Sequence, residues 1–400
     1  MRILILDGNE NQAVASVRSL GRAGYYVAVG ASSGWSKAGW SRFAHESFTY
    51  TAPRRDSARF VEDIAREVER TKEGALVLPM TERTTLPLSL HRERIFAAGG
   101  RLILPPHETL LRAFDKKQTT ALAASLGINV PRTVLIESRA SAERAACELD
   151  YPVVLKPRAS EEVTPDGKVA ATGGPLYARD NRELLEAYTR MRGRSSSVLA
   201  QEFIEGAGAG YFALMREGEL KMEFAHRRIR DVRPTGSGSA VRESVGLDPR
   251  VRDAGLKILR ALGWHGVAMV EFRVRADGTP VFLEVNGRFW HSLSLAVYSG
   301  ADFPLMLARM ADGSDVEAAP DYRVGVRCRW LLGDFRHLVE VMRGAPPAFT
   351  GRFPTRARTL ASFFLPVRGT YHDNFAMSDP LPELGDWLDF MTRRLVATEV

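Results

Sequence analysis

Two glutamates near residue 280 have the spacing of a metal site. Asp277-Gly278 predicts a two-residue type I′ turn between two strands. In the register that this turn sets, Glu271 lies directly across from Glu284, and Asn286 follows on the same face. Two carboxylates and an amide oxygen form a hard ligand set that suits Mg²⁺ or Mn²⁺, which take further ligands from water and substrate phosphates. The hairpin therefore predicts a metal site at Glu271, Glu284 and Asn286.

The opposite face of this hairpin supports the register, because it carries matched apolar pairs. Directly opposed carboxylates repel each other, so a compensating charge is expected. That charge can be a metal ion, or it can come from Arg273, Arg275 or Arg288. An exposed polar face that tolerates the repulsion is the other alternative. The apolar pairs are Val274 with Val281, Phe272 with Leu283 and Val270 with Val285.

The elements that must position the hairpin begin with an α/β region in the first hundred residues. Buried strands are predicted at 2–6, 26–29, 75–80 and 101–104, with helical patterns between them. This alternation predicts a parallel sheet with right-handed crossovers, which is a Rossmann-like domain. Asp7-Gly8-Asn9 stands where a dinucleotide fingerprint would begin, and the sequence has no P-loop pattern, so neither site is expected.

A region of different texture follows from about residue 115. The polar segment 158–174 contains Asp166-Gly167 and Gly173-Gly174, which predict a mobile loop. Residues 311–400 keep apolar clusters and are expected to fold, but no chemistry can be assigned to them. Helices are predicted at 117–126, 184–191 and 250–262, and strands at 153–156, 198–203, 211–216, 220–229, 267–275 and 280–286.

Four segments occur in the order found in the ATP-grasp superfamily, which the chain resembles over about residues 1–310. Further segments resemble the branch described as carbamoyl-phosphate-synthase-like or predicted carboligase, although Gly287 stands where that branch commonly has proline. The four segments are Asp115-Lys116-Lys117, Tyr151-Pro152-Val153-Val154-Leu155-Lys156-Pro157, Gln201-Glu202-Phe203-Ile204-Glu205-Gly206, and Glu271 with Glu284-Val285-Asn286-Gly287-Arg288. The branch segments are His226-Arg227-Arg228-Ile229-Arg230, Thr235-Gly236-Ser237-Gly238 and Ala301-Asp302-Phe303-Pro304.

The resemblance implies a fold of the α/β and α+β classes. A Rossmann-like pre-ATP-grasp domain would occupy residues 1–112, and a two-lobed ATP-grasp fold would follow at 113–310. The two lobes would be 113–197 and 198–310, and residues 311–400 would be a C-terminal extension of unassigned role.

The resemblance also implies a nucleotide site. Lys116, or alternatively Lys117, and Lys156 would contact the phosphates of ATP. The segment Gln201-Glu202-Phe203-Ile204 would hold adenine through the backbone of its second and fourth residues. The polar segment 158–174 would close over the nucleotide and exclude water.

The activity that the resemblance implies is an ADP-forming ligation of a carboxylate to an amine through an acyl phosphate. Arg288, Arg228 and Lys156 would be the catalytic residues, because the chemistry needs positioning and charge neutralisation more than a protein nucleophile. A bicarbonate-dependent carboxylase or carbamoyl-phosphate-type enzyme and a small-molecule phosphotransferase are alternatives on the same site. A homodimer is a superfamily-level expectation.

Several other residues are weaker candidates, each with an alternative role in packing or on a solvated surface. His226, Arg228 and Arg230 alternate along one strand and could reach one anion. Gly206, Gly208 and Gly210 are interpreted as a flexible turn rather than a phosphate cradle, and Glu205 could contact ribose. Trp290 and His291 follow the metal motif, and Thr81-Glu82 ends a strand of the first region, where ligands of α/β domains often bind.

The composition of the 400 residues excludes some other classes. Lys and Arg outnumber Asp and Glu by 55 to 48, but these charges are spread along the chain and no nucleic-acid-binding motif occurs, so no nucleic-acid partner is expected. No apolar run is long enough to span a membrane, and the first residues do not form a signal peptide. Two cysteines, Cys147 and Cys328, cannot build a disulfide framework, which favours a cytoplasmic location.

Overall fold

The N-terminal residues form a parallel five-stranded sheet in the order β3-β2-β1-β4-β5. The computed structural model describes residues 1–164, 168–195, 197–314, 321–345, 353–365 and 367–398, so the predicted Asp166-Gly167 turn lies outside the described residues. The first three predicted strands are confirmed, and the fourth, predicted at 101–104, is only the two residues of β5. Strand β3 is added at the edge, where its alternating exposure weakens the apolar signal. The strands are β1 (Arg2–Ile5), β2 (Tyr26–Ala31), β3 (Glu46–Thr49), β4 (Ala75–Leu78) and β5 (Gly100–Arg101).

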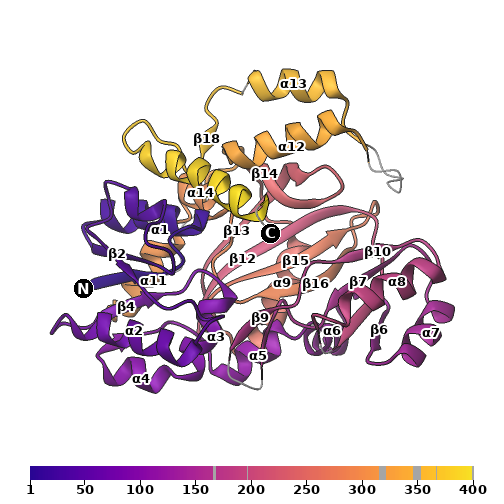
Figure 1. Ribbon diagram of the computed structural model, residues 1–400, viewed down its shortest axis with the longest axis horizontal. Helices are drawn as coiled ribbons and strands as arrows, with labels where there is room; N and C mark the ends of the chain where they lie inside the picture. Colours follow the sequence, from indigo (N-terminus) through magenta and orange to yellow (C-terminus); the bar gives the residue numbers. More distant parts are fainter. Residues whose placement is uncertain (165–167, 196, 315–320, 346–352, 366, 399–400) are drawn as a thin grey trace.

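Helices cover both faces of this sheet, as the predicted crossovers require (Figure 1). Val14 and Val17 of α1 pack with Ile3 on one face, and Phe60 and Ile64 of α2 belong to the core on the other face. Asp56 caps α2 by accepting the N–H of Arg59. The helices and the short 3₁₀ helix of this region are α1 (Asn11–Arg22), η1 (Ala38–Trp40), α2 (Ser57–Glu69), α3 (Glu82–Leu90), α4 (Arg92–Ala97) and α5 (His107–Phe114).

A small antiparallel sheet with two helices follows, at the right of Figure 1. Its strand order is β10-β7-β11-β6, and α7 and α8 share a hydrophobic core with it. The predicted loop 158–174 is corrected in part, because it contains a short hairpin of β8 (Glu161–Val163) and β9 (Val169–Ala171). The other elements are α6 (Lys116–Ser125), β6 (Thr133–Ile136), α7 (Arg139–Glu148), β7 (Val153–Pro157), β10 (Leu176–Ala178), α8 (Asn181–Met191) and β11 (Val198–Glu202).

A seven-stranded sheet at the centre of the molecule has the order β16-β15-β12-β13-β14-β17-β18. One face packs on α9 and the other on α1, α10 and α11, which joins this sheet to the N-terminal one. The predicted strands at 211–216 and 220–229 are confirmed, and Glu217 and Gly218 between them both have positive φ. The strands are β12 (Ala207–Arg216), β13 (Glu219–Arg233), β14 (Ser237–Ser244), β15 (Gly266–Val274) and β16 (Pro280–Asn286), and the helices are α9 (Pro249–Ala261), α10 (Leu293–Ser299) and α11 (Phe303–Ala311).

The turn of the β15–β16 hairpin differs from the predicted one. The N–H of Gly278 bonds to the carbonyl of Arg275 at 2.9 Å, and the N–H of Arg275 bonds to the carbonyl of Thr279 at 3.0 Å. Gly278 has a φ of 81°. These contacts define a three-residue turn that ends in a left-handed glycine, so the predicted two-residue type I′ turn is wrong.

The predicted pairing of the two glutamates is nevertheless confirmed. The three-residue turn starts the ladder one residue out of the expected register, with Phe272 opposite Phe282 instead of Leu283. A bulge at Leu283 then restores the register, so that Glu271 pairs with Glu284.

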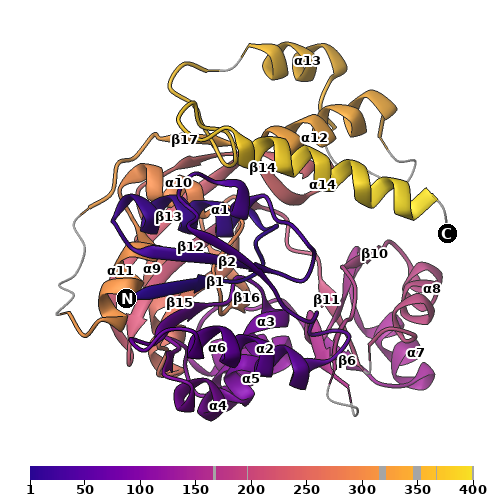
Figure 2. The same ribbon diagram turned by 60° about the vertical axis from the view of Figure 1, so that its left-hand side comes forward.

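The residues after 320 add to the edge of the large sheet and cover its end. Short strand β17 pairs with β14, and β18 pairs with β17 in parallel. In Figure 2, α12 and α13 lie above β14, and α14 runs across the top of the N-terminal region. The elements are β17 (Arg327–Arg329), α12 (Leu331–Arg343), α13 (Arg356–Phe364), β18 (Tyr371–His372) and α14 (Leu381–Thr398).

Buried polar contacts hold this C-terminal segment to the start of the chain. The guanidinium of Arg18 on α1 bonds to the Asp379 carboxylate at 2.8 Å. The ammonium of Lys37 bonds to the Asp386 carboxylate at 2.7 Å. All four side chains are nearly inaccessible to solvent, so each charge needs its partner. No helix among the described residues has the length and apolar character to cross a membrane.

Candidate functional site

The site is built around the two cross-strand glutamates. Each side chain is about a quarter exposed, 25% for Glu271 and 26% for Glu284. The amide of Asn286 donates to Glu284 Oε1 at 3.4 Å. The three predicted metal ligands are therefore neighbours on one face of the hairpin, and they face the centre of the molecule.

Two lysines from different elements reach toward this pair. Lys116 is buried at the start of α6, and its Nζ lies 3.4 Å from Glu284 Oε2. Asp115 caps α6 by accepting the N–H groups of Lys117 and Gln118, which fixes the orientation of the first turn. Lys117 is exposed. The cap thus turns Lys116, and not Lys117, toward the glutamates.

Lys156 lies on β7 and is also directed inward. Its Nζ donates to Gln201 Oε1 at 3.0 Å, and the Gln201 amide in turn donates to Thr133 Oγ1 at 3.1 Å. Burial lowers the pKa of Lys156, because the charged form loses hydration. Gln201 orients the ammonium group between the small sheet and the large one.

Two arginines compensate the carboxylates from the other side. Arg228 Nη2 lies 3.6 Å from Glu271 Oε1. Arg288 Nη2 donates to Asn286 Oδ1 at 3.2 Å, and its Nε lies 3.6 Å from Glu82 Oε1. Compensating charge is thus present, but from Arg228 and Lys116, because Arg273 and Arg275 bond to Gly206 and Glu202 instead. The distances to the glutamates exceed those of tight charge-assisted hydrogen bonds.

The two carboxyls have pKa values shifted in opposite directions. Burial raises the pKa of Glu271, and the nearby Arg228 does not fully offset it. Burial would raise the pKa of Glu284 as well, but Lys116 and Lys156 outweigh it and lower this pKa. Glu284 is therefore the firmer anion of the pair, and Glu271 takes up a proton more readily when no further cation is present.

The segment expected to hold adenine lies between the two sheets. The N–H of Glu202 bonds to the Arg132 carbonyl at 2.9 Å, and the N–H of Phe203 bonds to the Pro152 carbonyl at 3.2 Å. Within the described part of the chain, the N–H of Ile204 has no hydrogen-bond partner. Ile204 thus offers a free backbone donor beside the strand, at one of the two positions expected to contact the base.

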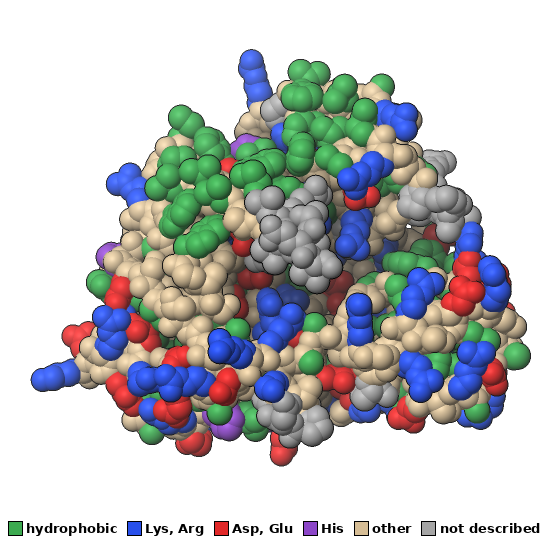
Figure 3. All heavy atoms as spheres, viewed as in Figure 1, with side chains coloured by type: hydrophobic (Ala, Val, Ile, Leu, Met, Phe, Trp, Pro, Cys, Tyr) green, Lys and Arg blue, Asp and Glu red, His purple; other side chains and the backbone are tan. Residues whose placement is uncertain are grey.

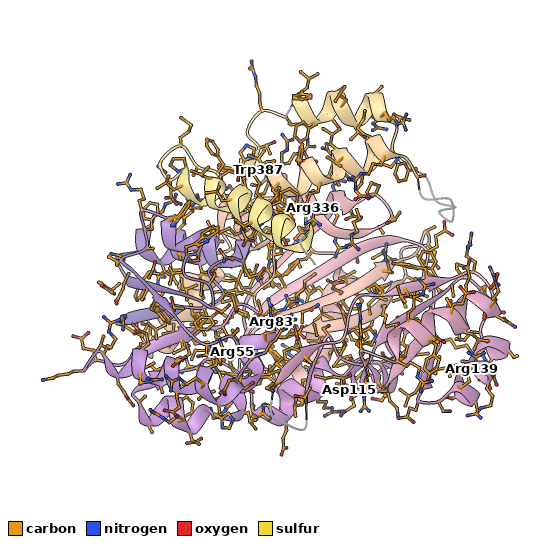
Figure 4. All side chains as sticks on the ribbon, in the orientation of Figure 1. Arg55, Arg83, Asp115, Arg139, Arg336 and Trp387 are labelled. Atoms are coloured by element: carbon orange, nitrogen blue, oxygen red, sulfur yellow. The ribbon has the colours of Figure 1, made fainter. Side chains whose placement is uncertain are left out.

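The hairpin β8–β9 brings further charges that the sequence pattern did not reveal. Glu161 on β8 accepts a bond from Arg54 at 2.9 Å and lies 3.8 Å from Arg83 on α3. Arg83, labelled near the middle of Figure 4, lies 3.6 Å from Glu10. These contacts join the hairpin to the N-terminal region, and no local signal could have found them, because the partners are far apart in sequence.

Basic and acidic side chains meet in a hollow at the centre of the face in Figure 3. Glu82 at the start of α3 contributes to this site from the N-terminal region, and burial raises its pKa. The weak candidate at Thr81-Glu82 is thus placed next to Arg288 and the hairpin. The position agrees with the tendency of parallel sheets to bind ligands at the carboxyl ends of their strands.

Other candidates lie elsewhere. His226 is buried, bonds to Ser292 at 2.8 Å and stacks on Phe212. Arg230 is paired with Asp334 on α12, so His226, Arg228 and Arg230 do not converge on one ligand. Trp290 is a core residue packed on Phe212 and Phe303.

The glycines after residue 205 are not a flexible turn, which corrects that interpretation. Gly208 and Gly210 lie inside β12, where they pair with Arg273 and Glu271 of β15. A Cβ on Gly210 would come within 2.8 Å of the Phe212 ring. The missing side chains leave room on this face for Arg228 and the glutamates.

Two further weak candidates are Glu205 and His291. Glu205 is exposed. His291 lies beside Trp330, and burial lowers the pKa of His291 to about 3.

The donor set fits a divalent cation such as Mg²⁺. No group of three or more His, Cys, Asp or Glu placed for a metal occurs in the described ranges, so the carboxylates here form a pair only. Mg²⁺ is typically bound by one or two carboxylates with the remaining positions filled by water and substrate phosphates. The loosely held pair Glu271 and Glu284, beside the side chains of Lys116 and Arg228, has that character.

Comparisons with known proteins show what the chain is similar to. Residues 198–333, which include β12 to β17, match a family model described as an ATP-grasp in the biosynthetic pathway with Ter operon. The D-alanine–D-alanine ligase of Nitrosospira multiformis is 30% identical over 194 residues, which is 45% of this chain and 60% of the ligase. The carbamoyl phosphate synthase large chain of Methanothermobacter thermautotrophicus is 26% identical over 332 residues, which is 75% of this chain and 30% of the synthase.

A solved structure supports the same fold. The biotin carboxylase domain of the Hydrogenobacter thermophilus 2-oxoglutarate carboxylase, crystallised with MgADP, ADP and bicarbonate, aligns with a TM-score of 0.63 at 16% identity. The alignment covers 82% of this chain and 73% of that one. The chain has the ATP-grasp fold, and the resemblance to the ATP-grasp superfamily is confirmed. It spans less than two thirds of the curated relatives that it matches.

Proposed function

We propose that this protein is an ADP-forming ligase that joins a small-molecule carboxylate to an amine at the expense of ATP. The observation that supports this most is the cross-strand pair Glu271 and Glu284, surrounded by Lys116, Lys156, Arg228 and Arg288. Such an arrangement suits a polyphosphate with a divalent cation, because it combines two loosely held carboxylates with several cations.

The nucleotide would lie between the small sheet and the large sheet. Adenine would bond to the backbone of Glu202 and Ile204, where the Ile204 N–H is free among the described residues. Gln201 would keep Lys156 directed at the phosphates, and Phe203 would border the base. Lys116 would contact the phosphates from the start of α6, and the exposed Lys117 would remain in solvent.

Glu271, Glu284 and Asn286 would hold Mg²⁺ or Mn²⁺, which would neutralise the phosphate oxygens and orient them. Arg288 and Arg228 would stabilise negative charge on the transferring phosphoryl group, and Lys156 would assist from the opposite side. The substrate carboxylate would attack phosphorus to give an acyl phosphate and ADP. The amine would then attack the acyl carbon and displace phosphate. The hairpin β8–β9 would limit access of water to the acyl phosphate.

The alternative with specific support is a bicarbonate-dependent reaction on the same site, because the match to the carbamoyl phosphate synthase large chain extends over 75% of this chain. A bicarbonate substrate would give carboxyphosphate in place of an acyl phosphate. Phosphotransfer to a hydroxyl is favoured by no particular contact among the described residues.

The experiment measures ADP release with pools of carboxylates, amino acids and amines, and identifies products by mass spectrometry. The proposal expects ADP release that needs both an acid and an amine, together with an amide product. ADP release that needs bicarbonate and no other acid supports the alternative. A stable phosphorylated product formed without any amine contradicts both.

The remaining expectations concern partners and location. We place the reaction in the cytoplasm, which is consistent with two unbonded cysteines, exposed Cys147 and buried Cys328. The homodimer and the lack of a nucleic-acid partner stay predictions. Light scattering of the purified chain tests the first, and salt-dependent binding to DNA or RNA tests the second.

A further inference from the structure

A cavity of about 630 Å³ lies between the edge of the large sheet and the C-terminal helices. Strands β13, β14 and β17 form one wall, and α12 and α13 form the other. Its volume is in the range of sites for small organic molecules. None of its lining residues belongs to the proposed nucleotide and metal site.

The side chain of Arg230, which lines the cavity, is on the other face of β13 from Arg228. Arg228 pairs with Arg242 on β14, whereas Arg230 pairs with Val241, because a bulge at Ile229 interrupts the ladder. Arg242 and Val241 are neighbours on β14, so they point to opposite faces of the sheet. Their partners Arg228 and Arg230 are therefore on opposite faces as well. Arg228 lies beside Glu271, and Arg230 lines the cavity.

The lining is rich in guanidinium groups from several elements. Arg230, Arg327, Arg329 and Arg358 come from β13, β17 and α13. The carboxylate of Asp334 accepts one bond from Arg230 and one, at 2.6 Å, from Nε of Arg329. A guanidinium has five N–H donors, so a single carboxylate leaves donors of both arginines for a further anion.

Arg358 adds an uncompensated positive charge. Within the described part of the chain, its side chain has no hydrogen-bond or ion-pair partner, and it is exposed at the cavity wall. The Arg329 guanidinium is held 4.5 Å from the centre of the Phe363 ring on α13. This cation–π contact positions α13 over the cavity and keeps the guanidinium plane fixed.

The rest of the wall is apolar or offers single polar atoms. Ile229, Leu365 and Val367 line the cavity with 44%, 76% and 54% of their surfaces exposed. These three side chains give part of the cavity wall an apolar surface. The Asp231 carboxyl also lines the cavity, and its buried Oδ1 has no hydrogen-bond partner among the described residues.

We propose that this cavity binds a small organic anion, with a phosphate or carboxylate head on Arg358, Arg230 and Arg329 and a short apolar body against Ile229 and Val367. The excess of positive charge favours an anionic head group, and the exposed aliphatic side chains favour an apolar body. The site is distinct from the nucleotide site, so its occupancy does not depend on the proposed ligase reaction.

The test uses n-hexyl phosphate as the probe, titrated calorimetrically into the full chain with MgADP in excess. Inorganic phosphate and n-hexanol serve as probes for the head and the body alone. We expect n-hexyl phosphate to bind the wild-type chain and to bind more tightly than either part. Arg358→Glu should weaken binding about tenfold or more, because it replaces an attractive charge by a repulsive one.

Arg356→Glu is the matched control, because this residue is on the same helix and does not line the cavity. The proposal expects its affinity for n-hexyl phosphate to stay within about twofold of wild type. Equal weakening by both substitutions would overturn the proposal, because it would indicate only a surface charge effect. No binding by the wild-type chain, or equal affinity for inorganic phosphate and n-hexyl phosphate, would overturn it as well.

Discussion

The molecule has two groups of carboxylates, one in the candidate site and one that anchors the C-terminal segment. Both groups are surrounded by cations, but at different distances. Glu271 and Glu284 have their nearest cationic nitrogens at 3.6 and 3.4 Å. Asp386, in contrast, accepts bonds from Lys37 at 2.7 Å and from the Trp330 indole at 2.6 Å.

The two groups also differ in exposure. Asp386 is 4% exposed and Asp373 is 1% exposed, whereas the site glutamates keep about a quarter of their side chains accessible. Asp373 accepts from Arg242 and from the Cys328 thiol. A closed, fully bonded carboxylate stabilises the fold, and an open one with loosely placed cations leaves coordination sites for a ligand.

The largest expected effect is on catalysis. Glu284→Gln keeps the shape of the side chain but removes the firmer anion of the pair, so ADP release should fall by about a thousandfold or more. The melting temperature should stay within about 2 °C of wild type, because the substitution also removes carboxylate repulsion. Thermal unfolding and a coupled ADP assay measure both. Substantial activity in this variant would contradict the metal assignment.

The opposite pattern is expected at the closed carboxylate. Asp386→Ala leaves the buried Lys37 ammonium without its partner and should lower the free energy of unfolding by about 3–5 kcal/mol. Urea unfolding followed by circular dichroism measures this, with Asp253→Asn as the control, because Asp253 is exposed on the surface of α9. If both substitutions lower the free energy of unfolding by the same amount, the C-terminal contacts are not the structural anchor described above.

A third effect depends on pH and concerns Glu383, next to Asp386. Burial, with a contribution from Asp386, raises the pKa of Glu383 from 4.5 to about 7. Between these values the folded chain binds a proton that the unfolded chain does not, so the stability from this group is present at low pH and falls as pH rises. The free energy of unfolding should fall by up to about 3 kcal/mol across this pH range because of this group, and that fall should be absent in the Glu383→Gln chain.

Urea unfolding at pH 5 and pH 7.5 checks this prediction. The wild-type chain should lose more stability between the two pH values than the Glu383→Gln chain does. Equal losses in the two chains would show that Glu383 has an ordinary pKa in the folded state.

The smallest effects separate the two adjacent lysines. Lys116→Ala should raise the KM for ATP about tenfold, because its ammonium lies 3.4 Å from Glu284 in the site. Lys117→Ala should leave both kcat and KM within about twofold, because that side chain is exposed. Steady-state kinetics of the pair decides the assignment, and the reverse pattern would exchange their roles.

Much of the site could be predicted from the sequence, because its residues lie on elements with strong local patterns. The alternating apolar residues of β15 place Glu271 on the polar face of the hairpin, and the predicted pairing with Glu284 holds because two unpredicted features offset each other. The turn could not be predicted, because Asp277-Gly278 fits a two-residue turn as well as a three-residue one. The bulge at Leu283 cancels the resulting shift of the strand register. Nothing in the order of apolar and polar residues indicates this bulge.

The contacts between segments far apart in the sequence were not predictable, for a different reason. The anchors of the C-terminal segment join residues hundreds of positions apart, such as Arg18 with Asp379, and each residue alone resembles an ordinary surface charge. The contacts of Glu161 with Arg54 and Arg83 are of the same kind. Periodicity reports which face of an element is buried, but it does not report what covers that face.

The bonds of Arg18 have a consequence for the order in which the chain folds during synthesis. Its guanidinium donates to Asp379 and to the backbone carbonyls of Asp373 and Asn374, so α1 cannot bury this charge until those residues exist. Residues 1–22 are made before residues 373–379, so α1 receives these partners only after a long further stretch of chain has been synthesised. The burial of Arg18 on α1 is therefore complete only after residue 379 has been added.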